Sequence, residues 1–100
     1  MRTLIRNVRV FDGERTVPQA DVLIDGGRIA EVTAGPVDVE VDGAGKTLLP
    51  GLIDAHAHAW DGDLEEALKF GVTTELDMNN LPPILAEQRR QAAERDDVAD

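Results

Sequence analysis

The first half of the chain alternates apolar and polar residues over short runs that turn signals separate. Residues 3–10 are rich in β-branched side chains and end at an Asp-Gly pair at 12–13, a pattern that favours a strand followed by a turn. Residues 21–24 and 28–33 flank the Asp-Gly-Gly run 25–27, where glycine accepts the positive φ angles of a tight hairpin. This pattern predicts short strands joined by turns.

A strict alternation of valine and acidic residues over 37–42 predicts one more strand. Side chains of a strand point alternately to its two faces, so Val37, Val39 and Val41 are expected on one buried face and the acids in water. A glycine-rich break follows this strand. Residues 1–49 are therefore predicted to form a small β-sandwich-like N-terminal domain.

After residue 50 the pattern changes to strand signals that alternate with helix signals. The apolar runs 52–58 and 72–78 have the length of strands, and the stretches 63–70 and 81–92 that follow them read as helices. Strand and helix in alternation are the repeat of a parallel α/β fold. Two such units cannot close a (β/α)₈ barrel, which needs eight of them and typically ~250 residues. We therefore expect the chain to stop within a larger fold.

Polar residues and glycine predict where the two helices begin and end. Asp63 is expected to cap the first helix and Asn80 the second, because their side chains accept hydrogen bonds from N–H groups of the first turn. Gly71 is expected just after the first helix, in the left-handed conformation that ends many helices. The charged run 94–97 is expected to be a solvated helix end followed by a loop.

The charge balance excludes several classes of partner. Ten Lys and Arg against 20 Asp and Glu give a net charge of −10, which opposes binding to nucleic-acid phosphates and anionic lipid. We therefore expect neither a nucleic-acid nor a membrane partner. Because the chain has no cysteine, any metal must be held by His, Asp, Glu or a modified Lys. The N-terminus has no apolar run of signal-peptide length, so the cytoplasm is the expected location.

The two histidines of the chain, His56 and His58, fall at the end of the predicted strand 52–58. Because strand side chains alternate, both share a face with Asp54. Positions i and i+2 rise ~6.6 Å along a strand, from which two imidazoles that lean together reach one metal at ~2.0–2.1 Å. The alternative is that two surface histidines lie close together by chance. The shared face and the strand position favour a metal-ligand pair.

The motif around these histidines resembles that of a known family. Residues 49–58, Leu-Pro-Gly-Leu-Ile-Asp-Ala-His-Ala-His, resemble the signature of the amidohydrolase superfamily. Residues 71–78, Gly-Val-Thr-Thr-Glu-Leu-Asp-Met, resemble the second barrel strand of its imidazolonepropionase-like and prolidase-like branches. Residues 5–13 and 24–30 are similar to the N-terminal β-domain of the family. The likeness covers nearly the whole chain.

This resemblance implies the N-terminal part of a metal-dependent hydrolase of the α/β class, a (β/α)₈ TIM barrel with a small β-sandwich formed by both chain ends. Residues 50–100 would be the first two βα units, with His56 and His58 as ligands of one or two divalent ions, most often Zn²⁺. A metal-activated water would attack a C–N or ester-type carbonyl of a small-molecule substrate. The other ligands and the proton-shuttling Asp would lie past residue 100, so this chain alone is expected to be inactive.

Three residues near the histidines each have two interpretations. Asp54 either orients an imidazole by accepting a ring N–H or bonds to nearby backbone. Asp77 either points into the mouth of the barrel or is a buried acid paired with Arg or backbone amides. Trp60 either lines a substrate pocket or packs a loop onto the fold.

A non-enzymatic alternative stays open, namely a catalytically silent barrel homologue that acts as a scaffold or assembly protein. Two further His and an Asp on later strands would separate the enzyme from this scaffold. Self-association into a homo-oligomer that covers exposed sheet edges also stays open. The substrate is left open among cyclic amides, dipeptides with C-terminal proline, aminated bases and N-acyl sugars.

Overall fold

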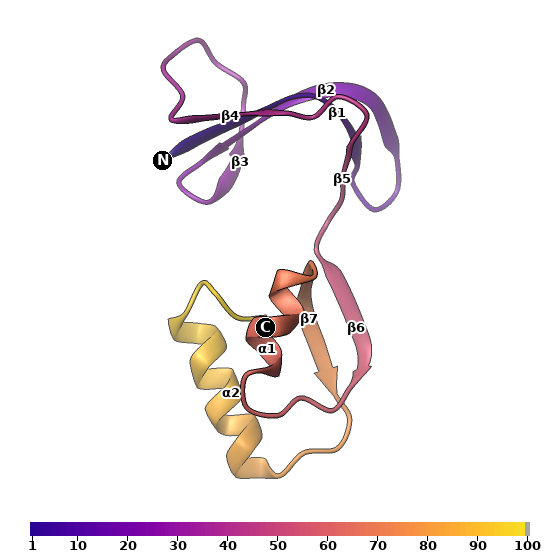
Figure 1. Ribbon diagram of the computed structural model, residues 1–100, viewed down its shortest axis with the longest axis vertical. Helices are drawn as coiled ribbons and strands as arrows, with labels where there is room; N and C mark the ends of the chain where they lie inside the picture. The colour runs from indigo at the N-terminus through magenta and orange to yellow at the C-terminus, as the bar shows by residue number, and fades with distance from the viewer. Residues whose placement is uncertain (100) are drawn as a thin grey trace. The chain divides into compact units, whose positions relative to one another are not determined.

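The computed structural model describes residues 1–99, which divide into two compact units. Unit 1 covers residues 1–50 and unit 2 begins at Gly51. The last residue of the second predicted domain, Asp100, lies outside the described residues. Figure 1 shows unit 1 built of strands and unit 2 of strands and helices. No helix among the described residues is long and apolar enough to cross a membrane.

Unit 1 is a sheet built on one long central strand. Its strands are β1 (Arg2–Phe11), β2 (Thr16–Asp25), β3 (Arg28–Ala30), β4 (Val39–Asp42) and β5 (Thr47–Leu48). β1 pairs antiparallel with β2 and parallel with β4 and β5, and β3 forms a hairpin with β2. The predicted hairpin turn is confirmed, because Gly26 and Gly27 both have positive φ angles, of 56° and 78°.

The buried core of unit 1 is small and consists of three side chains of the β1–β2 pair. Leu4, Val8 and Leu23 are between 2% and 6% exposed. Leu4 and Leu23 are directly opposite each other across the two strands, so their side chains pack on the same face. This face of the sheet stabilises unit 1.

The predicted burial of the valine face in 37–42 is wrong for two of its three residues. Val37 is half-buried, but Val39 and Val41 are 42% and 38% exposed. The register pairs Val41 with Ile5, which points away from the face that carries Leu4. No second layer from residues 1–50 covers that opposite face, so alternation placed the valines together without burying them.

Unit 2 has the predicted order of strand, helix, strand and helix. The elements are β6 (Leu52–Ala57), α1 (Asp63–Lys69), β7 (Val72–Asp77) and α2 (Pro82–Glu94). β6 and β7 pair in parallel, with α1 as the connection between them. The mixed α/β class and the parallel βα units predicted for this half are confirmed.

The N-terminus of α1 differs from the prediction. Gly62, in the left-handed region, is the N-cap, and Asp63 is the first helical residue. The Asp63 carboxylate accepts the backbone N–H of Trp60 at 2.7 Å, so it closes the loop before the helix. At the other end, Gly71 follows the helix with a φ of 86°, as predicted.

The predicted cap of α2 is also wrong. Leu81 is the N-cap and makes no side-chain capping bond. Pro82 and Pro83 occupy the first helical positions and lack the N–H groups that a side-chain cap at this end would bind. The Asn80 side-chain amide therefore bonds elsewhere.

The prediction of a solvated helix end followed by a loop at 94–97 is confirmed, since Glu94 ends α2 and Glu94, Asp96 and Asp97 are exposed, but the residues around this run make contacts that were not predicted. Arg95 forms an ion pair with Glu65 of α1. Val98 and Ala99 are buried, at 8% and 0% exposed, and pack against Leu64 in the core of unit 2. The segment that follows α2 thus returns to α1 and completes this core.

Gly51 lies at a close approach of the chain to β7. A Cβ atom placed on it would overlap the hydroxyl and methyl groups of Thr73. We expect Gly51→Ala to destabilise unit 2 by about 1–3 kcal/mol, the usual cost of overpacking. Amide hydrogen exchange of β6 and β7 measures this loss. The same substitution in a Thr73→Gly background should cost less, and an equal loss in both backgrounds would contradict the overlap.

Candidate metal centre

The two predicted ligands lie together at the carboxyl end of β6. The ring centroids of His56 and His58 are 5.3 Å apart, and the ring planes are inclined by 64°. Both histidines are exposed to solvent. They border an open depression of about 480 Å³, whose lining includes Asp54 and Glu75. The structure therefore brings both imidazoles to one accessible place.

Among residues 1–99, no three or more His, Asp or Glu side chains converge in a way that could hold a metal ion. His56 and His58 thus form a pair of nitrogen donors without a third protein donor beside them in the described chain. A pair of this kind could supply only part of a zinc ligand set, since zinc sites in proteins commonly have three or four protein ligands.

Asp54 bonds to backbone and not to an imidazole ring. Its Oδ1 accepts the backbone N–H of His56 at 3.0 Å. Of the two interpretations open from the sequence, this is the backbone one. Asp54 therefore holds the main chain at His56 and does not fix the ring.

Asp77 is paired with amides. Its Oδ2 accepts the side-chain amide of Asn80 at 2.9 Å, and its Oδ1 accepts the backbone N–H of Asn79 at 3.1 Å. The Asn80 bond is the largest cause that lowers the pKa of Asp77, and the charge of His58 contributes least. Asp77 is half-buried and not fully buried, but its amide partners match the second of its two interpretations.

Glu75 adds negative charge beside the histidines. It lies opposite Asp54 in the β6–β7 register, and its Oε2 is buried without a hydrogen-bond partner among the described residues. Burial raises the pKa of Glu75 most, followed by the charges of Asp54, Asp63 and Asp77. Several carboxylates so close together produce a local potential that favours a bound cation.

Asn80 and Gln88 lie next to the site, a role that no pattern in the sequence indicated. Their side-chain amides both donate to the carbonyl of Ala59, the residue after His58, at 2.5 Å and 2.8 Å. Contacts of a side chain with a distant carbonyl leave no spacing pattern in a sequence. The two prolines after Leu81 are the one signal that argued against a capping role for Asn80.

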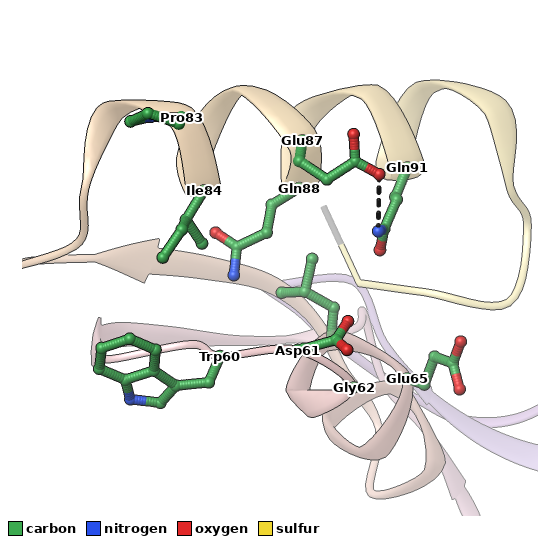
Figure 2. A pocket seen from close by; sticks show the side chains of 10 residues that line it. Trp60, Asp61, Gly62, Glu65, Pro83, Ile84, Glu87, Gln88 and Gln91 are labelled. Carbon is green, nitrogen blue, oxygen red and sulfur yellow. Dashed lines mark hydrogen bonds between the residues drawn. The ribbon is translucent and has the colours of Figure 1, made fainter.

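Trp60 borders a groove of about 360 Å³ between α1 and α2. Its side chain is 57% exposed. Figure 2 shows Trp60 and Asp61 on one side of this groove and Pro83 and Gln88 projecting from α2 on the other. Neither histidine lines it. Trp60 therefore lines a groove that is separate from the depression at the histidine pair, and a role for it in a substrate pocket stays a prediction.

Comparison with known proteins gives matches over most of the chain. L-hydantoinase from Paenarthrobacter aurescens is 30% identical over 113 residues, which cover 92% of this chain and 24% of the relative. Dihydroorotase from Endomicrobium trichonymphae is 32% identical over 96 residues, which cover 85% of this chain and 23% of the relative. The solved structure of molinate hydrolase matches with a TM-score of 0.72 and 26% identity, over 93% of this chain and 27% of that one. No protein-family model matches the chain.

The chain belongs to the amidohydrolase superfamily. The family assignment made from the run 49–58 is thereby confirmed, as is the expectation that the likeness concerns an N-terminal portion. This amidohydrolase chain spans about a quarter of the length of the curated relatives it matches.

Proposed function

We propose that this amidohydrolase chain is part of a metal-dependent hydrolase that cleaves a C–N bond of a small molecule, with His56 and His58 as two metal ligands. The observation that carries the proposal is the pair of exposed imidazoles 5.3 Å apart at the carboxyl end of β6. Relatives named hydantoinase and dihydroorotase support a cyclic amide as the substrate class. The imidazolonepropionase-like or prolidase-like branch stays a narrower prediction within this proposal.

The separation of the rings fits a single ion held by both. Zn–N bonds are about 2.0–2.1 Å long, so two rings whose centroids are 5.3 Å apart would reach one ion if a nitrogen of each ring turned toward it. The negative charge of Asp54 and Glu75 beside the rings also suits a cation.

A divalent ion at this pair would supply a water of lowered pKa and polarise the scissile carbonyl. The residues of this chain position the two imidazoles. Asp54 bonds the backbone at His56, and β7 pairs with β6 so that both rings leave the strand at its carboxyl end. This is the end at which parallel α/β folds build their sites, because the loops that follow the strands meet there.

The architecture proposed around the pair is a (β/α)₈ barrel of which unit 2 supplies the first two βα units. Unit 1 would be one half of a β-sandwich that another part of the protein completes. The exposed apolar face of unit 1 supports this, since Ile29 is 79% exposed and Val39 and Val41 are more than a third exposed. The proposed partner is a small-molecule substrate, with the homo-oligomer left as a further arrangement.

A zinc titration followed on the two imidazoles tests the proposal. The chain has two histidines, so the imidazole signals of a ¹H–¹⁵N spectrum come from His56 and His58 alone and are distinct from the indole signal of Trp60. In the presence of excess Mg²⁺, which occupies surface carboxylates because it prefers oxygen ligands, one nitrogen of each ring should shift at the same Zn²⁺ concentration. Rings that do not respond, or that respond at different concentrations, would contradict a shared ion and favour the catalytically silent alternative.

A further inference from the structure

The carbonyl of Ala59, one residue beyond His58, is shared by two side-chain amides from different elements. Asn80, between β7 and α2, donates through Nδ2 at 2.5 Å, and Gln88 of α2 donates through Nε2 at 2.8 Å. Figure 2 shows Gln88 reaching from α2 toward the segment that carries Trp60. Since Ala59 is only 3% exposed, its carbonyl depends on donors within the protein.

Both polar atoms of the Asn80 side chain form hydrogen bonds. Nδ2 also donates to Oδ2 of Asp77 at 2.9 Å, and Oδ1 accepts the backbone N–H of Leu81 at 2.8 Å. A primary amide has two N–H donors, and here they meet two acceptors. Rotation of the amide by 180° would place its oxygen against the Ala59 carbonyl and the Asp77 carboxylate, so one orientation is strongly preferred.

His58 therefore lies between two fixed peptide groups. On its N-terminal side, the carbonyl of Ala57 accepts the backbone N–H of Met78 at 3.0 Å. On its C-terminal side, the next peptide unit but one, Ala59–Trp60, is held at its carbonyl by Asn80 and Gln88 and at its N–H by Asp63. Because peptide units are planar, only the backbone angles of His58 and Ala59 can vary between the two anchored units. The direction of its Cα–Cβ bond, and with it the reach of the imidazole, is restricted.

We propose that Asn80, supported by Asp77 and Gln88, is a positioning residue that aims the His58 imidazole toward His56. This rests on the proposed function only in the step from ring position to metal affinity. Without the Asn80 amide, the Ala59 carbonyl would keep one of its two donors and Asp77 would lose its side-chain partner. The end of β6 would then sample more conformations, fewer of which place both rings within reach of one ion.

Asn80→Ala in the intact protein tests this, with Asn79→Ala as the matched control. The Asn79 side chain takes no part in the hydrogen bonds of residues 1–99, and its backbone N–H to Asp77 survives truncation. We expect Asn80→Ala to lower the Zn²⁺ affinity about tenfold, the lower end of the range for residues that orient a ligand. Asn79→Ala should leave it unchanged. Competition with a chromophoric chelator measures both.

A second measurement needs no metal. In the metal-free protein, the cross-relaxation between the two imidazole rings reports their proximity, and Asn80→Ala should weaken it whereas Asn79→Ala should not. If Asn80→Ala fails to fold, Gln88→Ala replaces it and should produce a smaller effect in the same direction. An unchanged ring contact in a folded variant would overturn the inference. If Zn²⁺ shifts neither imidazole signal of the wild-type protein, the proposed function is wrong. The contact between the two rings in the metal-free protein still shows whether Asn80 positions His58.

Discussion

Replacement of His56 and His58 by Ala is expected to abolish the Zn²⁺ binding that persists in excess Mg²⁺, with a loss of affinity on the order of a hundredfold or more. Removal of a residue that merely orients a ligand costs about 10–100-fold, so loss of the nitrogen donors themselves should exceed that range. No other histidine and no cysteine is present in the chain to take their place. Chelator competition or calorimetry gives the affinity.

The single variants separate a shared ion from two independent sites. If both rings hold one ion, His56→Ala and His58→Ala should each lose nearly as much affinity as the double variant, because the pair acts as a unit. Gln91→Ala, a half-buried position on α2 that does not line the depression at the histidine pair, serves as the control and should bind as the wild type does. Full binding by the double variant would contradict the metal-ligand assignment and leave surface carboxylates as the source.

Truncation of Leu23 is expected to have the largest effect on stability, about 2–5 kcal/mol, as for other buried Leu→Ala changes. Leu23 is 2% exposed and packs opposite Leu4 in the small core of unit 1. Unit 1 has few other buried side chains that could move into the space left by Leu23, so a cavity would remain. Urea unfolding followed by hydrogen exchange of the β1 and β2 amides assigns the loss to unit 1.

Ile29→Ala is the matched control for Leu23→Ala. Ile29 lies on the neighbouring strand β3 and is 79% exposed, so its truncation should change stability by no more than about 0.5 kcal/mol. A loss for Ile29→Ala equal to that for Leu23→Ala would contradict the exposed face described for unit 1. Such a loss would show that another part of the protein covers this face of unit 1.

Local patterns carried the elements of both units. Alternating valines and Asp-Gly turns predicted β1, β3, β4 and the second half of β2, but not the first half of β2 or β5. The apolar runs 52–58 and 72–78 predicted β6 and β7 within one residue at their ends. The His-x-His spacing placed both imidazoles on one side of a strand. These features depend only on residues near each other in the chain, because strand and helix periods are local properties.

Contacts between residues that are far apart in the sequence could not be predicted from such local patterns. The burial of Val98 and Ala99 beside α1 was missed because the charged run before them reads as a solvated end. Asn80 read as a helix cap because capping residues and residues that bond a distant carbonyl have the same chemistry. Val39 and Val41 had the alternation of a buried strand, but burial needs a second layer that alternation cannot specify.

Local sequence patterns identified the superfamily, the order of strands and helices, and the two imidazoles that we propose as metal ligands. The tertiary structure alone decided how those donors are held. It brings Asn80 and Gln88 to the carbonyl beyond His58, turns Asp54 and Asp77 toward amides, and leaves Glu75 partly buried among other acids. The physical reason is that a ligand spacing is set along one strand, whereas the direction of a ligand is set by hydrogen bonds from elements that only folding brings to it.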